Sequence, residues 1–132
     1  MKKILQVAAL VTLGATTAQA DGGEQWLFEA SNRITAPTGE AIYATVCTAC
    51  HQADGKGAVG AGAYPTLTAL PGGPDYPMQV VMNGQAGMPP FGGILDDNQV
   101  AEIVNYIRTN FGNTDTENPA TAEMAAALRS TK

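Results

Sequence analysis

The 132-residue sequence is poor in the residues that most metal and nucleic-acid sites require. It contains one histidine, two cysteines and seven basic residues against twelve acidic ones, for a formal net charge of −5. A zinc site takes about four Cys, His or acidic ligands at paired spacing, and the sequence has no second cluster to supply them. Because nucleic acid is bound chiefly through basic side chains, the acidic balance argues against nucleic acid as a partner.

No apolar run reaches the roughly 20 residues that a membrane-spanning helix needs. The run Ile4–Ala15 follows Lys2 and Lys3 and precedes an A-x-A site at 18–20, a pattern typical of a cleaved signal peptide. We therefore expect residues 1–20 to be removed and the mature chain to be periplasmic, with no membrane span. Five of the seven basic residues then remain against all twelve acidic ones. Such a surface either only confers solubility or steers a basic partner toward the protein, and both interpretations stay open.

The length and the lack of an internal repeat predict one folded domain. We place this domain at 38–112, between an N-terminal extension at 21–37 and a C-terminal extension at 113–132. The N-terminal extension holds the apolar triplet Trp26–Phe28, which either docks on a partner or, the interpretation we favour, folds back onto its own domain. In the C-terminal extension Thr121 is a candidate N-cap for a short helix that packs on the surface.

The two cysteines and the one histidine stand together as Cys47, Cys50 and His51. Two cysteines in an exported chain ordinarily suggest a disulfide, and the C-x-x-C spacing also suits a thiol redox motif, although the βαβ frame of the latter is missing. A lone histidine is more often an ordinary core or surface residue. Directly after C-x-x-C, however, it completes the C-x-x-C-H motif for covalent haem attachment, in which two thioethers hold the haem and the imidazole binds the iron.

With no second histidine, the opposite iron ligand is a methionine, a weaker donor, or none. Met124 lies in the C-terminal extension, and Met78 and Met82 fall in a short helical pattern, so packing explains these three. Met88 lies within 87–93, where two prolines stiffen the backbone and three glycines permit tight turns. We therefore predict Met88 as the second iron ligand. A methionine that merely fills a gap is the alternative, because Met packs almost anywhere.

The periodicity predicts helices and no convincing strand. One helix covers roughly 39–48, and a second covers 76–83, with Asp75 as N-cap and Gly84 as its stop. The clearest helix starts after the N-cap Asp96, has Gln99 for a capping box, and ends near Phe111. Its apolar face consists of Val100, Ile103, Val104 and Ile107. So small a chain would be marginally stable alone, and a large apolar cofactor would supply the core that it lacks.

From 39 to 112 the sequence resembles class I cytochromes c, the small all-α proteins whose helices wrap around one haem. The resemblance rests on Gly39, Tyr43 and the C-x-x-C-H motif, then on Tyr64-Pro65, on Met88-Pro89-Pro90-Phe91, and on a last helix with Tyr106 and Arg108. It implies that the N- and C-terminal core helices cross, with Gly39 and Tyr43 against Ile103 and Tyr106. It also implies that the Pro65 carbonyl accepts a hydrogen bond from the His51 ring, which orients the imidazole, and that Tyr64 and Pro65 belong to the haem site.

Within that family the sequence is most similar to small cytochrome subunits and partner cytochromes of bacterial periplasmic dehydrogenases. This implies one covalent haem c, ligated by His51 and Met88, that carries single electrons. A dehydrogenase would be the donor, and an oxidase or another cytochrome in the respiratory chain the acceptor. A permanent dehydrogenase subunit is the alternative. A peroxidase or gas-binding protein is disfavoured, since no second histidine is available as a distal acid or base. A disulfide-stabilised binding module is a further alternative, and it would require the expressed protein to be uncoloured.

Overall fold

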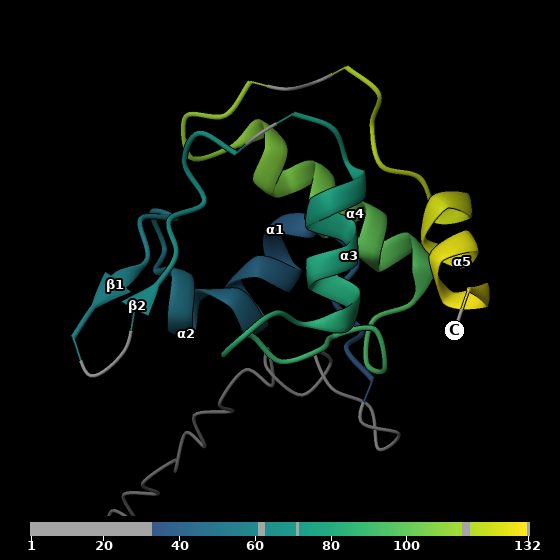
Figure 1. Ribbon diagram of the computed structural model, residues 1–132, viewed down its shortest axis with the longest axis horizontal. Helices are drawn as coiled ribbons and strands as arrows, with labels where there is room; N and C mark the ends of the chain where they lie inside the picture. The colour runs from purple at the N-terminus through teal and green to yellow at the C-terminus, as the bar shows by residue number, and fades with distance from the viewer. Residues whose placement is uncertain (1–32, 61–62, 71, 115–116, 132) are drawn as a thin grey trace, which may run out of the picture.

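The computed structural model describes residues 33–60, 63–70, 72–114 and 117–131 as a mostly helical domain (Figure 1). The predicted signal peptide and the triplet Trp26–Phe28 lie outside the described residues. In chain order the elements are α1 (Gly39–Ile42), the π-helical turn η2 (Tyr43–Cys47), α2 (Thr48–His51), β1 (Ala58–Val59), β2 (Ala63–Tyr64), α3 (Asp75–Asn83), α4 (Asp97–Thr109) and α5 (Ala122–Ser130). In the described part of the chain, no helix is long and apolar enough to cross a membrane.

The first helix is continuous from α1 through η2 to α2 and is longer than predicted. Thr38 caps its start by accepting a hydrogen bond from the amide of Ala41 at 3.2 Å. A π-helical turn then widens the helix, and the helix ends at His51 because Gln52 takes φ 62°. The helix predicted for 39–48 thus extends three residues further and includes the whole C-x-x-C-H motif.

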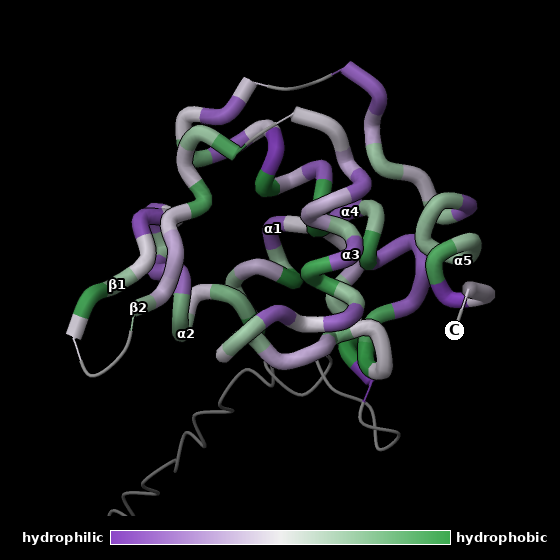
Figure 2. Tube along the Cα trace, in the orientation of Figure 1, coloured by the Kyte–Doolittle hydropathy of each residue, from purple (hydrophilic) through white to green (hydrophobic). Residues whose placement is uncertain are grey.

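Two other boundary predictions and the absence of strands need correction. Asp75 is the first residue of α3, and Pro74, which makes no side-chain cap, holds the N-cap position. The last core helix ends at Thr109, because Asn110 is extended and Phe111 has φ 57°. A two-stranded antiparallel hairpin also exists, with Ala58 opposite Tyr64 and Val59 opposite Ala63. The hairpin projects at one edge of the domain, and β1 is hydrophobic there (Figure 2).

Helices α1 and α4 cross at a very short distance, as the resemblance implied. A Cβ atom on Gly39 would collide with the carbonyl oxygen of Glu102 and lie 2.6 Å from Cβ of Tyr106. One turn later the ring centroids of Tyr43 and Tyr106 are 5.6 Å apart. The predicted capping box starts α4, with Asp96 accepting from the amide of Gln99 and the Gln99 side chain accepting from the amide of Asp96.

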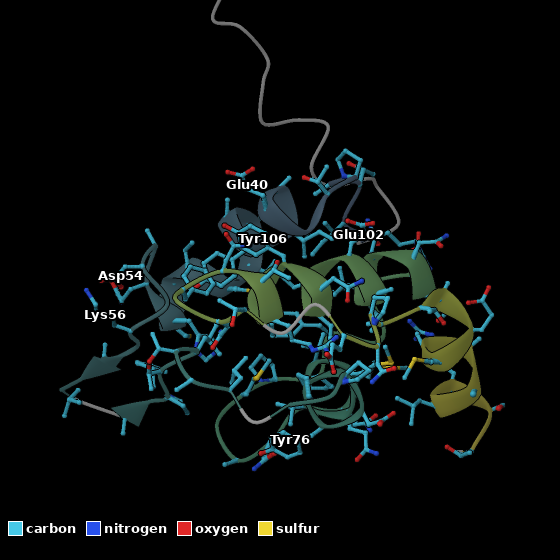
Figure 3. All side chains as sticks on the ribbon, turned by 90° about the horizontal axis from the view of Figure 1, so that it is seen from above. Glu40, Asp54, Lys56, Tyr76, Glu102 and Tyr106 are labelled. Carbon is cyan, nitrogen blue, oxygen red and sulfur yellow. The ribbon has the colours of Figure 1, made fainter. Side chains whose placement is uncertain are left out.

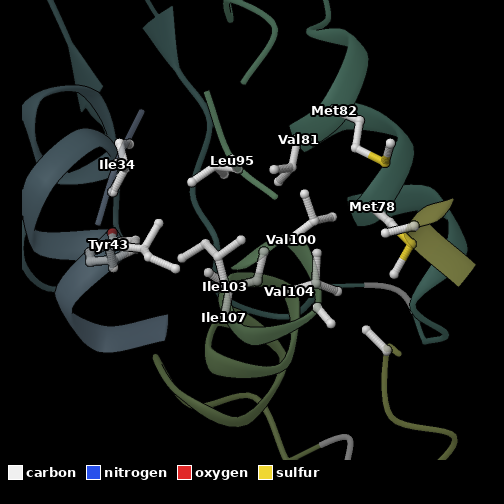
Figure 4. Close-up of a cluster of buried hydrophobic side chains, with 14 of the residues drawn as sticks. Ile34, Tyr43, Met78, Val81, Met82, Leu95, Val100, Ile103, Val104 and Ile107 are labelled. Atoms are coloured by element: carbon white, nitrogen blue, oxygen red, sulfur yellow. The ribbon is translucent and has the colours of Figure 1, made fainter. Parts of the chain in front are cut away.

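The core lies between α1, α3 and α4 (Figure 4) and includes part of the predicted N-terminal extension. Ile34 and Ala36 are buried, and the Gln99 amide nitrogen donates to both of their carbonyl oxygens, at 2.6 and 3.1 Å. The predicted apolar face of α4 is buried in full. The segment just before α1 is therefore structurally part of the domain.

The C-terminal extension packs against α4, as predicted for its short helix (Figure 1). Thr121 caps α5 by accepting from the amide of Met124 at 3.4 Å. Upstream, the side chain of Asn105 exchanges two hydrogen bonds with the backbone of Ala120, at 2.8 and 2.9 Å. Ala125 is fully buried. These contacts join α5 to the domain at several points.

Candidate functional site

Cys47, Cys50 and His51 lie within two turns at the end of the first helix. Cys47 closes the π-helical turn, and the other two belong to α2. All three are half-buried, and both cysteines are free thiols. Burial raises the pKa of the Cys47 thiol to about 12, with a smaller contribution from Cys50. The helical geometry thus places two thiols and an imidazole side by side.

The ring of His51 is held by the hydrogen bond that the resemblance implied. Its Nδ1 lies 2.9 Å from the carbonyl oxygen of Pro65. A carbonyl oxygen only accepts, so Nδ1 is the hydrogen-bond donor, and in that tautomer of the neutral ring the Nε2 lone pair suits a metal ligand. The chain returns close to His51 because Gly57 donates its amide to the His51 carbonyl at 3.0 Å, with φ 70°. A Cβ atom on Gly57 would collide with the backbone of Tyr64 and Pro65.

Met88 is one of the two residues that close a tight turn after α3. Gln85 and Met88 exchange two backbone hydrogen bonds, at 2.9 and 3.1 Å, across Ala86, which has φ 51°. The amides of Phe91 and Gly92 then donate to carbonyl oxygens in the last turns of α3, at 2.9 and 3.1 Å. The loop is thereby bound at both ends to one helix.

The side chains of the four described methionines differ in burial. Met78 and Met82 are buried among the core side chains of α3 and α4 (Figure 4), and Met124 packs on the edge of the core. Their burial agrees with the packing role expected from the sequence. Met88 is half-buried against the core, as Met124 is, but it lies on a loop instead of a helix.

Residues 35–107, more than half of the chain, match the family model described as cytochrome c oxidase, cbb3-type, subunit III. The chain belongs to this cytochrome c family. It is an electron-carrying cytochrome c domain, and its Cys47 and Cys50 pair is consistent with one covalently attached haem c.

Two curated relatives share part of their sequence with this cytochrome c. The gluconate 2-dehydrogenase cytochrome c subunit of Pantoea cypripedii is 33% identical over 108 residues, which cover 70% of this chain and 24% of that protein. The fructose dehydrogenase cytochrome subunit of Gluconobacter japonicus is 35% identical over 92 residues, covering 57% of this chain and 19% of that protein. The chain therefore spans a quarter or less of the length of these relatives.

The cytochrome c has hydrophobic side chains that its own core leaves partly uncovered. Several hydrophobic side chains are packed against the core on one side and only partly buried, so a large apolar group would cover their open side. Those in the first helix, the loop after β2 and the segment between α3 and α4 include Val46, Leu67, Leu70, Phe91 and Ile94, and others lie in α4 and α5. In the described ranges no group of three or more His, Cys, Asp and Glu residues is placed to hold a metal ion.

Sequence reasoning missed most of these apolar neighbours. Leu67, Leu70 and Ile94 lie outside regular helices, where no periodicity marks an inward-facing position. The only signal was their hydrophobic residue type. Tyr64 lies in β2 with its side chain 45% exposed, while its backbone belongs to the turn that brings Pro65 to His51.

One cavity of the described part lies away from the C-x-x-C-H motif. It has a volume of about 350 Å³ and lies between the segment 33–37 and the start of α4. Its lining contains Arg33, Asp96 and Glu102 but none of the predicted haem residues. We assign the site from the donor atoms and their geometry, because a covalent haem is specified by the thiols and the imidazole.

Proposed function

We propose that this cytochrome c carries single electrons on a haem held by Cys47 and Cys50 and ligated by His51 and Met88. The observation that carries the proposal is the 2.9 Å contact between His51 Nδ1 and the Pro65 carbonyl. This contact leaves the lone pair of Nε2 available to bind the iron. When bound, haem supplies an iron that alternates between ferric and ferrous states. His51 holds one side of it, and Tyr64 and Pro65 line the site.

Met88 is the proposed second ligand because its loop is preorganised. The hydrogen bonds between Gln85 and Met88 and those from Phe91 and Gly92 to α3 hold the loop at four points. A ligand on such a loop loses little conformational entropy on binding, which suits a weak thioether donor. With both His51 and Met88 bound, the iron would have no open position for oxygen or peroxide, and this would favour electron transfer.

We further propose that the protein is exported to the periplasm. There it takes electrons from a dehydrogenase and passes them to an oxidase or another cytochrome of the respiratory chain. The signal-peptide pattern at 1–20 supports export. The names of the two relatives support a dehydrogenase partner. Because both relatives are named as subunits, permanent attachment to a dehydrogenase is the second candidate. Purification of the tagged protein from its own cells distinguishes the two, because a permanent subunit co-purifies with the dehydrogenase and a free carrier does not.

Optical spectra of the holoprotein test the ligation. We expect the oxidised wild type to show a low-spin c-type haem with the weak far-red charge-transfer band of a methionine–iron bond. Met88→Ala should lose that band and bind carbon monoxide in the reduced state. Met82→Ala, the matched control, should keep the band, because Met82 is 5% exposed in the core. A high-spin wild type that binds carbon monoxide or peroxide would favour an enzyme, and an uncoloured protein would refute haem attachment.

A further inference from the structure

One arginine of the C-terminal helix binds the segment that follows the Met88 loop. In α5, Arg129 donates from Nε to a carboxylate oxygen of Asp97 at 2.5 Å and from Nη2 to the carbonyl oxygen of Leu95 at 2.6 Å. Its Nη1 donates to the carbonyl oxygen of Gly92. The guanidinium is about one-third exposed and the Asp97 carboxylate likewise. A single planar group thus connects α5 to both ends of the segment between the loop and α4.

We propose that α5, acting through Arg129, positions the Met88 loop and so sets the strength of the methionine–iron bond. The inference rests on the proposed ligation by His51 and Met88. Its central residue is Gly92, whose amide donates to the Met82 carbonyl at 3.1 Å while its own carbonyl accepts from Arg129. A Cβ atom on Gly92 would lie 2.8 Å from the Met82 carbonyl oxygen. The loop therefore ends between α3 and α5.

The contact is a feature of this chain beyond the matched family region. The family model ends at residue 107, whereas α5 begins at Ala122. The helix that presents Arg129 is itself anchored by the buried Ala125 and by the Asn105–Ala120 hydrogen bonds. Because the helix is anchored independently of Arg129, the guanidinium holds the loop segment against a fixed support.

The strength of an axial methionine is measured by competition with an added ligand. An added imidazole binds the iron only when the thioether has left, so its apparent affinity rises with the fraction of time that the loop is open. Loss of the Arg129 contacts should increase that fraction. A weaker thioether should also lower the reduction potential, because thioether ligation raises it.

The test is an imidazole titration of the ferric holoprotein, with the reduction potential measured on the same samples. We expect Arg129→Ala to bind imidazole about tenfold more tightly than wild type, the factor that the loss of one charge-assisted hydrogen bond gives. Arg129→Lys keeps the charge but not the planar set of donors, so its affinity should fall between the two. A lower potential should accompany both changes.

Thr121→Ala is the matched control, because it removes the N-cap of α5 and leaves the Arg129 contacts in place. It should lower the thermal midpoint while leaving the imidazole affinity within about twofold of wild type. Wild-type affinity in both Arg129 variants, or an equal rise in Thr121→Ala and Arg129→Ala, would overturn the inference. If Arg129→Ala yields no holoprotein, the imidazole affinity of Arg129→Lys alone tests the inference. A wild type with no methionine–iron band would instead refute the ligation on which the inference rests.

Discussion

The hydroxyl of Tyr43 connects the first helix to the residue that follows His51. It donates to the carbonyl oxygen of Gln52 at 2.7 Å, where the chain leaves the helix at φ 62°. The ring packs between Tyr106 and Phe111, with centroids 5.6 and 4.8 Å away. Burial raises the pKa of Tyr43 to about 12, so the hydroxyl keeps its proton and remains a donor across the physiological pH range.

Replacing Tyr43 by Phe should therefore cost about 1 kcal/mol of folding free energy, since it leaves a partly buried carbonyl without its donor. Chemical denaturation of the holoprotein measures the loss. The matched control is Tyr76→Phe, which removes a hydroxyl that donates to Gln85 at an exposed site, 3.0 Å away. Tyr76→Phe should lose less than half as much folding free energy as Tyr43→Phe. Equal losses in the two variants would contradict the role assigned to Tyr43.

At the site, the sequence was sufficient for the residues with distinctive chemistry and insufficient for their apolar neighbours. The C-x-x-C-H motif identified the thiols and the imidazole, and the family resemblance supplied the Pro65 hydrogen bond that the structure contains. Leu67 and Leu70 were missed because tertiary contacts alone place them beside the core. The role of Arg129 was missed for the same reason, since its partners lie at least 32 positions earlier in the chain.

At the level of elements, the crossing of α1 and α4 is the contact that orders the fold. A Cβ atom at position 39 has no room, because the carbonyl of Glu102 and Cβ of Tyr106 already occupy that space. Gly39→Ala should separate the two helices and lower the unfolding free energy by about 1–3 kcal/mol, as overpacking does. The thermal midpoint and the denaturant midpoint measure this change.

Gly60→Ala is the control for that substitution, because nothing lies within 4 Å of a Cβ atom at Gly60 and its φ is not positive. It should change stability by less than about 0.5 kcal/mol. A Gly39→Ala protein as stable as the control would mean that the helices adjust without cost, which contradicts a close-packed crossing.

Helix boundaries could be predicted where a side chain caps the helix. They could not be predicted where backbone geometry alone determines the end of the helix. The caps at Asp96 and Thr121 were predicted from residue type and are present. The π-helical turn that carries the first helix on to His51 has no pattern of its own in the sequence. The hairpin was missed because its strands of two residues each are too short to show alternation.

At the level of the whole molecule, the chain segments that supply Pro65 and Met88 are poor in charge. From 57 to 95, the range that supplies Pro65 and Met88, the one charged residue is Asp75. The exposed large hydrophobic side chains of the described part, Val59, Tyr64 and Tyr76, all belong to this range. Glu40 and Glu102 lie on the side of α1 and α4, opposite Tyr76 (Figure 3), and the Asp54–Lys56 pair is internally neutral at 2.8 Å.

This distribution favours the interpretation that the acidic surface only confers solubility. Charges more than a Debye length away, about 10 Å at 0.1 M salt, contribute little to an encounter at the haem site. The rates of oxidation by an anionic iron cyanide and of reduction by a cationic ruthenium ammine should each change by less than about twofold between low and high salt. A steep fall with the cation and a steep rise with the anion would show that the net negative charge steers partners after all.

The most direct test of the account is the proton NMR spectrum of the reduced holoprotein. A methionine that binds a diamagnetic haem iron has its methyl group over the ring, whose current shifts that signal far upfield. We predict one such methionine methyl, assigned through its sequential connectivities to Met88, together with a His51 Nδ1 proton protected from exchange by the Pro65 carbonyl. The absence of any upfield methionine methyl, or its assignment to Met82, would contradict the proposed His51–Met88 ligation.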